Sequence, residues 1–231
     1  MTITYIGHSG FAIETGKVTV VSDFYIDPVG VIDDIIARAT HLIVTVSHSH
    51  RDHLCNDIFT WSNVKRYIIA NECRRKLMRH YPIATMPVTF MSPGATVVVD
   101  GITIHSFLST DVGVCYLIDI DDTKIFHAGD FNLWISDGMP IASRRKARGD
   151  FNRILSEIAN YSPHIDVAMF PVIPNLGGDF AAGARYFLDA VEVGTFIPMH
   201  TWGRDREAAD ALRCFAGKHL VTLQAGDTLN S

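Results

Sequence analysis

Cysteine is scarce in this sequence. Only four of its 231 residues are cysteines, they lie far apart, and none forms a Cys-x-x-Cys pair. Zinc ribbons need paired cysteines and disulfide frameworks need closely spaced ones, so the sequence argues against both classes of protein. Sparse, unpaired thiols fit a reducing compartment, and we therefore predict a cytoplasmic protein. The four residues are Cys55, Cys73, Cys115 and Cys214.

Long apolar segments and an excess of positive charge are also missing. No stretch approaches the roughly 18 uninterrupted apolar residues of a membrane span, and the first residues lack the basic and apolar regions of a signal peptide. The formal net charge is −5, whereas a protein that binds nucleic acid usually carries a basic face. The basic run at 144–148 is an exception, which we interpret as a solvated helix start. We expect neither a membrane nor a nucleic acid as a partner.

The composition that remains is typical of a globular protein, because 48% of the residues are hydrophobic and 19% are charged. A chain of this length can bury a full hydrophobic core without disulfide bonds. No linker rich in glycine, proline or serine divides the chain. We therefore predict one domain over residues 1–231 and leave its oligomeric state open.

Short segments rich in Val, Ile, Thr and aromatic residues predict strands, and helical periodicity or capping residues predict helices between them. In the first half the expected strands are 2–7, 10–15, 17–23, 42–47, 66–70, 88–91, 96–99 and 101–107, and the expected helices are 31–39 and 71–81. In the second half the expected strands are 113–120, 124–130, 167–172, 195–199 and 220–223, and the expected helices are 150–161, 179–191 and 205–215. This order predicts an α/β fold with mixed sheets.

The segment SHSHRDH at 47–53 directly follows an apolar strand and carries three histidines and an aspartate. Clustered imidazoles gain nothing by packing, but imidazole and carboxylate are both ligands of borderline divalent ions such as zinc. In an extended segment His48, His50 and Asp52 would point to one side, and His53 would break the alternation. We therefore predict one ion bound by two imidazoles and a neighbouring ion bound by a carboxylate with an imidazole.

This segment resembles the signature of the metallo-β-lactamase superfamily. FHAGD at 126–130 is similar to the family's strand that ends in Gly-Asp, and FIPMHTW at 196–202 is similar to its late strand that delivers a histidine. The hairpin at 5–23 resembles that of the branch with ascorbate-phosphate lactonases and related phosphodiesterases. The resemblance covers most of the chain in the family's order, and it implies an α/β fold built as a four-layer αβ/βα sandwich with metal ions at its rim.

Carried over residue by residue, the resemblance implies a cofactor of one or two divalent metal ions, with zinc, manganese and iron as candidates. The implied ligands are His48 and His50 for the first ion, Asp52, His53 and His200 for the second, and Asp130 between them.

The sequence departs from the family at the first ion. The family normally supplies a third histidine from the loop before the strand expected at 113–120, but that loop reads FLSTDVG here. Two interpretations stay open. Either Asp111 replaces the imidazole and makes the site harder, which favours manganese or iron over zinc, or the first site is weak and only the second fills.

Other candidates carry weaker signals. We interpret His8 as a proton donor or as a hydrogen-bonding neighbour of the ligands, and Asp23 as an acceptor for the N–H of a ligand imidazole. The loop 174–179 either presents backbone N–H groups to an anion or is an Asp-capped helix start. We expect a structural role for His105, which lies within a strand.

Metal ions held by imidazoles and carboxylates support hydrolysis of esters, lactones, lactams, thioesters and phosphodiesters alike, so the ligands indicate the reaction and not the substrate. We assign catalytic roles to Asp130, Asp52 and His8. We expect a metal-dependent hydrolase whose partner is a small-molecule ester, lactone or phosphate compound. Two alternatives stay open: a non-catalytic metal-binding or regulatory protein, because of the missing histidine, and a compact phosphodiesterase or nuclease, because of the basic run at 144–148.

Overall fold

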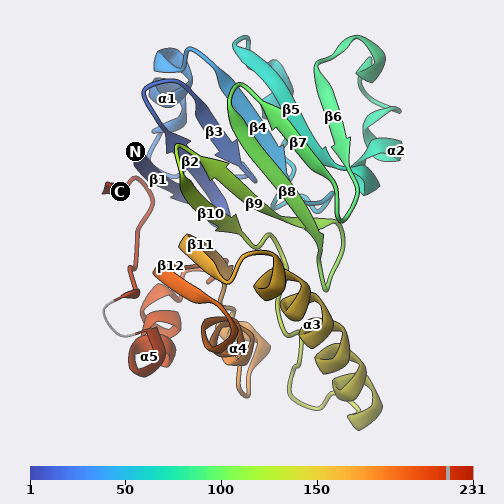
Figure 1. Cartoon of the computed structure of the whole chain (residues 1–231), viewed down its shortest axis with the longest axis vertical. Coiled ribbons are helices and arrows are strands. Elements are labelled where there is room, and N and C mark those ends of the chain that lie inside the picture. The colour runs from blue at the N-terminus through green and yellow to red at the C-terminus, as the bar shows by residue number, and fades with distance from the viewer. Residues whose placement is uncertain (217–218, 231) are drawn as a thin grey trace. The chain divides into compact units, whose positions relative to one another are not determined.

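A computed structural model of the chain describes residues 1–216 and 219–230. By their contacts these residues form two compact units, and each unit contains one β-sheet (Figure 1). Unit 1 comprises Met1–Ser92 together with the chain from Leu223 onward, and unit 2 comprises Pro93–Thr222. The single domain over residues 1–231 stays a prediction.

The sheet of unit 1 has seven strands in the order β13-β1-β2-β3-β4-β5-β6. Antiparallel pairs join β1 to β2 and β2 to β3, whereas β3, β4, β5 and β6 run parallel to one another. Every residue of β4 is buried, as expected for an apolar strand covered on both faces. The strands are β1 (Thr2–Gly7), β2 (Gly10–Glu14), β3 (Thr19–Ser22), β4 (Leu42–Val46), β5 (Val64–Ala70), β6 (Val88–Met91) and β13 (Thr228–Asn230).

The parallel strands bring two candidate residues to the same edge of this sheet. β3 and β4 are neighbours in register, with Ser22 paired with Thr45. Both strands end at this edge, and the N–H of Asp23 donates to the carbonyl of Thr45 at 2.9 Å. Asp23 therefore lies beside Ser47, the first residue of the histidine segment.

The helix expected at 31–39 is confirmed as α1 (Ile32–Arg38), which buries Ile32 and Ile35. The helix expected at 71–81 is too long. A 3-10 turn, Asn71–Cys73, leads into the single-turn helix α2 (Arg74–Leu77), and turns follow. These two elements bury only one residue each, and a longer helix gains too little from packing to persist. Further 3-10 turns are Asn56–Thr60 and Ile83–Thr85.

The sheet of unit 2 has six strands in the order β12-β11-β10-β9-β8-β7. Strands β7 to β10 form an antiparallel meander, and β10, β11 and β12 run parallel. The parallel strands again end at one edge, and Asp130 and His200 follow shortly after the ends of β10 and β12. The strands are β7 (Thr96–Val99), β8 (Ile102–Leu108), β9 (Val114–Ile120), β10 (Thr123–His127), β11 (His164–Pro171) and β12 (Glu192–Met199).

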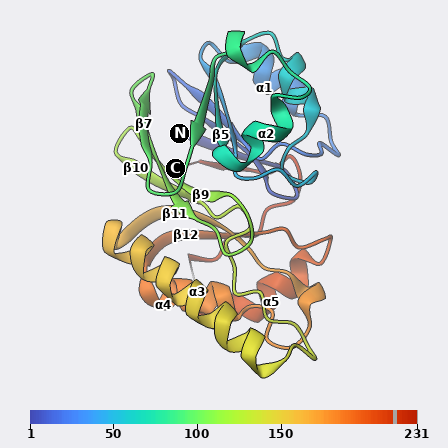
Figure 2. The same cartoon turned by 90° about the vertical axis from the view of Figure 1, so that its right-hand side faces the viewer.

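Three helices accompany this sheet: α3 (Ile141–Tyr161), α4 (Ala182–Ala190) and α5 (Asp205–Ala216). Figure 2 shows them grouped beside β11 and β12, and contacts join α3 to β8 and both α4 and α5 to β12. A 3-10 turn, Pro174–Leu176, follows β11. Stacked phenylalanines fill the core of the unit, as in the pair Phe131–Phe151 with ring centroids 4.9 Å apart.

Several expected boundaries in the second half are displaced by no more than three residues, and two expectations differ further from the structure. α3 begins at Ile141 rather than at 150, and the basic run 144–148 lies within its first turns, where 144–146 are exposed as interpreted from the sequence. The strand expected at 220–223 is wrong. Leu220 makes one isolated bridge to β12, and the chain pairs again only at β13, beside β1.

Among the described residues no helix combines the length and the hydropathy needed to cross a bilayer. The four cysteines are free thiols, in agreement with the absence of a disulfide framework. Burial raises the pKa values of Cys73 and Cys115 so far that both stay protonated.

We predict that Gly183→Ala in α4 destabilises the protein. A Cβ at this position would lie 2.1 Å from Asn132 Oδ1 and 2.8 Å from Leu133 N, so the helix or the 132–133 segment must shift. We expect the free energy of unfolding in urea to fall by about 1–3 kcal/mol, the usual cost of overpacking.

The matched control is Gly149→Ala in α3, where a Cβ meets nothing within 4 Å. Replacing this helical glycine should stabilise the protein by about 0.5–1 kcal/mol. A gain in both variants would show that α4 does not pack on the segment after Asp130.

Candidate functional site

The histidine segment is turned rather than extended. The N–H groups of His53 and Leu54 both donate to the carbonyl of His50, at 3.1 and 2.9 Å. The expected alternation of side chains is therefore wrong. Instead, the rings of His48 and His53 lie 4.1 Å apart by their centroids, and both side chains are fully buried, whereas His50 is exposed.

Asp23 holds both ends of this segment. Its carboxylate accepts hydrogen bonds from the N–H of Ser47 at 2.7 Å, from the hydroxyl of Ser47 at 2.5 Å, and from Nδ1 of His53 at 2.7 Å. Asp23 is 1% exposed, so water does not compete for these bonds. The predicted role of Asp23 as the acceptor for a candidate ligand imidazole is confirmed, on His53.

These bonds fix the tautomers of two histidines. A carboxylate only accepts, so His53 carries its proton on Nδ1, and its lone pair is on Nε2. The hydroxyl proton of Ser47 goes to Asp23, so Ser47 accepts from Nδ1 of His48 at 2.9 Å, and His48 likewise has its lone pair on Nε2.

The lone pair of His48 points towards a second imidazole. His48 Nε2 lies 3.0 Å from Nδ1 of His50. Two nitrogens bound to one tetrahedral zinc at about 2.0–2.1 Å lie roughly 3.3–3.4 Å apart, so this spacing is close to that of two ligands of one ion. The two residues lie side by side, and their role as ligands of one ion stays a prediction.

His8 joins the same unit from the turn after β1. Its Nε2 lies 3.2 Å from Oδ2 of Asp52, and its ring lies edge-on to that of His53 with centroids 5.9 Å apart. One donor atom each of His8, Asp52 and His53 lies within 4.8 Å of the others. Unit 1 thus brings together all of the candidate residues that it carries.

A second set of hydrogen bonds to the segment was not predicted from the sequence. Ser49, between two candidate ligands, donates to Glu72 through both its N–H and its hydroxyl, and its carbonyl accepts from Lys76 at 2.7 Å. Exposed glutamates and lysines are too common to be singled out from sequence. Glu72 and Lys76 belong to the turn and helix around α2, so this element supports the histidine segment.

Unit 2 places Asp130 and His200 together. His200 Nε2 lies 3.4 Å from Asp130 Oδ1, and these side chains are only 6% exposed. The carbonyl of Asp130 accepts from Nε1 of Trp134 at 2.9 Å, and the Trp202 ring stands edge-on to His200. A tryptophan therefore contacts each candidate, Trp134 at Asp130 and Trp202 at His200.

Asp111 is exposed and lies in the same unit beside Asp130, with carboxylate oxygens within 4.8 Å of each other. Its loop is tied down: Thr110 donates to the carbonyl of Asn132 at 2.6 Å and accepts from the N–H of Asn132 at 3.0 Å. Two carboxylates this close repel each other, and a bound cation relieves that repulsion. The role of Asp111 as a ligand stays a prediction.

Of the weaker candidates, the loop 174–179 does not present an open ring of N–H groups. The carboxylate of Asp137 packs against this loop. One of its oxygens lies 2.7 Å from the position that a Cβ at Gly178 would occupy. His105 is structural as expected: it stacks on Tyr161 with centroids 4.1 Å apart and bonds to Thr96 through Nδ1.

Three candidates share a left-handed backbone. The φ angles are 58° for His8, 44° for Asp23 and 60° for His200, and each residue directly follows a strand. For a residue with a side chain this conformation costs on the order of 1–3 kcal/mol and persists where the surroundings impose it, often at functional sites. Among the described residues, three of the seven non-glycine residues with this conformation are thus candidates from the sequence.

The donor sets fit divalent cations. Unit 1 offers the ring nitrogens of four histidines and the carboxylate of Asp52, and unit 2 offers Asp111, Asp130 and the imidazole of His200. Imidazole nitrogens suit zinc and related transition metals, and carboxylates extend the range to manganese and iron.

Comparison with known proteins identifies the family. A profile described as a beta-lactamase superfamily domain matches residues 2–145. The chain belongs to the metallo-β-lactamase superfamily. A UPF0173 metal-dependent hydrolase from Methanospirillum hungatei is 28% identical over 223 residues, which cover 87% of this chain and 82% of the relative. Another from Pyrococcus furiosus is 27% identical over 248 residues and 98% of both chains.

The fold agrees with this family. The structure of Igni18, a metallo hydrolase from Ignicoccus hospitalis, is similar with a TM-score of 0.71 at 18% identity, over 99% of this chain and 97% of that chain. The likeness shows the metallo-β-lactamase fold and confirms the predicted α/β class. The relatives' name agrees with the predicted enzyme class, a metal-dependent hydrolase.

We predict that Asp23→Asn weakens metal binding by about 10–100-fold, the usual effect of losing a partner that orients a ligand histidine. An amide nitrogen cannot accept from His53 or Ser47, so at least one of these hydrogen bonds is lost. Competition with a chromogenic chelator measures the affinity directly. Asp33→Asn, an exposed change on α1, is the control. Equal affinity in both variants would contradict the role given to Asp23.

Proposed function

We propose that the protein is a metal-dependent hydrolase that acts on a small ester, lactone or phosphate-containing molecule. The proposed ligands are those predicted from the sequence: His48, His50, Asp111 and Asp130 for one ion, and Asp52, His53, His200 and Asp130 for the other. Zinc, manganese and iron are the candidate metals, and a cytoplasmic location stays a prediction.

The observation that carries this proposal is the network around Asp23. One buried carboxylate fixes the tautomers of His48 and His53, so that the lone pair of each is on Nε2. An imidazole that only packs in a core does not need a defined tautomer. An imidazole that binds a metal does, because its lone pair must point in a fixed direction. Membership of a family whose named relatives are metal-dependent hydrolases supports the same function.

A bound divalent ion would supply a water with its pKa lowered from 15.7 to about 7 and would polarise the oxygen of the substrate. Asp130 would accept a hydrogen bond from the attacking water and so direct its lone pair at the substrate. His8, 3.2 Å from Asp52, would donate a proton to the leaving oxygen.

The substrate class is a small, polar or phosphorylated molecule. The donors serve esters, lactones and phosphodiesters alike, so the substrate must be decided by assay. A panel of p-nitrophenyl esters, lactones and bis-p-nitrophenyl phosphate, each tested with zinc, manganese and ferrous iron, would show which bond is cleaved. Absence of turnover with every metal would favour a non-catalytic metal-binding protein. Steeply salt-dependent RNA or DNA binding would favour a nuclease.

We predict that His50→Ala and His200→Ala each lower turnover by more than about 100-fold, because each removes a proposed ligand and not merely its support. Far-UV circular dichroism should stay unchanged, since both residues follow strands and leave the cores intact. His80→Ala, at an exposed position outside the proposed ligands, serves as the control. Loss of the folded signal in both variants would mean that these histidines are core residues and not ligands.

We predict that a chelator releases two metal ions in separate steps and that manganese or iron restores more activity than zinc. At the first ion Asp111 stands where the family normally supplies a third histidine, so this site has one imidazole fewer than the family pattern and should bind zinc more weakly. Asp111→His should restore the imidazole and reverse the preference towards zinc. Simultaneous release of both ions, with zinc as the best reactivator of the unchanged protein, would refute the role of Asp111.

A further inference from the structure

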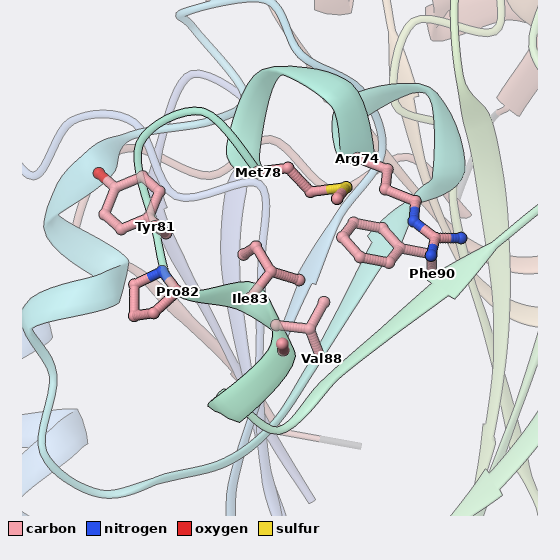
Figure 3. A pocket seen from close by; sticks show the side chains of 8 residues that line it. Arg74, Met78, Tyr81, Pro82, Ile83, Val88 and Phe90 are labelled. Carbon is pink, nitrogen blue, oxygen red and sulfur yellow. The ribbon is translucent and has the colours of Figure 1, made fainter.

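Unit 1 contains a cavity of about 410 Å³ that no part of the proposed reaction uses. It lies below α2, beside the 3-10 turn Ile83–Thr85 and the edge strand β6 (Figure 3). Met78, Ile83 and Val88 line its middle, and Tyr81 and Pro82 close one end. A cavity of this size is at the lower end of the range typical of small-molecule sites.

The walls of this cavity are apolar although they face solvent. Met78 is 61% exposed, and Val88 and Phe90 are only half-buried. β6 is the edge strand of its sheet, and among the described residues no further strand pairs with it. Contiguous exposed apolar surface of this kind commonly marks a binding site.

A cation stands at the end opposite Tyr81. The guanidinium of Arg74 lies over the ring of Phe90, 5.5 Å from its centroid, and makes no ion pair among the described residues (Figure 3). Arg75 and Arg79 are exposed on the same short segment. The nearby carboxylate of Glu72 accepts hydrogen bonds from Ser49 and forms no ion pair with Arg74, so the guanidinium of Arg74 can pair with a ligand.

We propose that this cavity binds a small amphipathic anion, a medium-chain acyl or aryl carboxylate. Its carboxylate pairs with Arg74, and its apolar body lies along Met78, Ile83 and Val88 towards Pro82. Charge favours this direction, because the negative charge of Asp57 acts on Tyr81 at the far end and would repel a carboxylate there. The ligand is a free molecule in solution.

The position of the cavity matters for the histidine segment. The 3-10 turn Asn71–Cys73 and α2, which border the cavity, also carry Glu72 and Lys76. Both side chains form hydrogen bonds with Ser49 in the histidine segment. A ligand that orders this element therefore acts on the support of the histidine segment without touching a proposed metal ligand.

The test is titration calorimetry of the full chain with sodium decanoate below its micellar concentration, with 1-decanol and decyltrimethylammonium as probes of the same length. We expect decanoate to bind, decanol to bind more weakly and the cation not to bind. Arg74→Gln should lower the affinity for decanoate about tenfold or more and leave that for decanol nearly unchanged, because only the charge-assisted contact is lost. Arg75→Gln, next on the helix and outside the cavity, is the matched control.

A second variant tests the apolar body of the site. Met78→Ser should weaken decanoate and decanol alike, and at such an exposed position it should leave far-UV circular dichroism unchanged. No binding of decanoate, equal binding of the cationic probe, or an equal loss in Arg74→Gln and Arg75→Gln would each overturn the proposal. Binding to vesicles of anionic lipid without binding to decanoate would overturn it in favour of a membrane surface.

Discussion

The carboxylate of Asp23 accepts hydrogen bonds from the start and from the end of the histidine segment, and the order of unit 1 around its candidate ligands depends on it. Through Ser47 it reaches His48, and directly it reaches His53. Burial strengthens each bond and makes an unmatched partner costly. The chain separation between Asp23 and Ser47 is 24 residues, and only the parallel pairing of β3 with β4 brings them to one edge.

Much of this arrangement could be predicted from the sequence, because residues that follow adjacent parallel strands meet at one edge. This ground accounts for the acidic residue after β3 and the histidines after β4, whereas Asp130 and His200, after β10 and β12, were predicted from the resemblance to the superfamily. The turn within the histidine segment was not, since alternation of side chains holds only while the backbone is extended. Two hydrogen bonds to the carbonyl of His50 decide that conformation, and no side-chain pattern encodes them.

Other features were hidden for a different reason. The hydroxyl of Ser47 and the carboxylate of Glu72 belong to residue types that occur throughout any surface, and only their neighbours give them a role. The short α2 shows the same limit for helices: its sequence has a cap and a stop, but too few apolar side chains are buried for a longer helix. The two units also differ in chemistry. Most candidate donors of unit 1 are imidazoles, and most of those of unit 2 are carboxylates. The residues that follow the strands cause this difference, not the strands themselves.

β13 pairs with β1, and the two strands are separated by almost the entire chain, with Thr2 bonded to Asn230 across 228 positions. During synthesis the outer edge of β1 is therefore made long before its partner. Until Thr228–Asn230 leaves the ribosome, this edge keeps exposed backbone N–H and C=O groups, the arrangement that recruits strands from other chains. The sheet that carries the histidine segment is thus completed last, and its vulnerability to aggregation depends on the speed of translation.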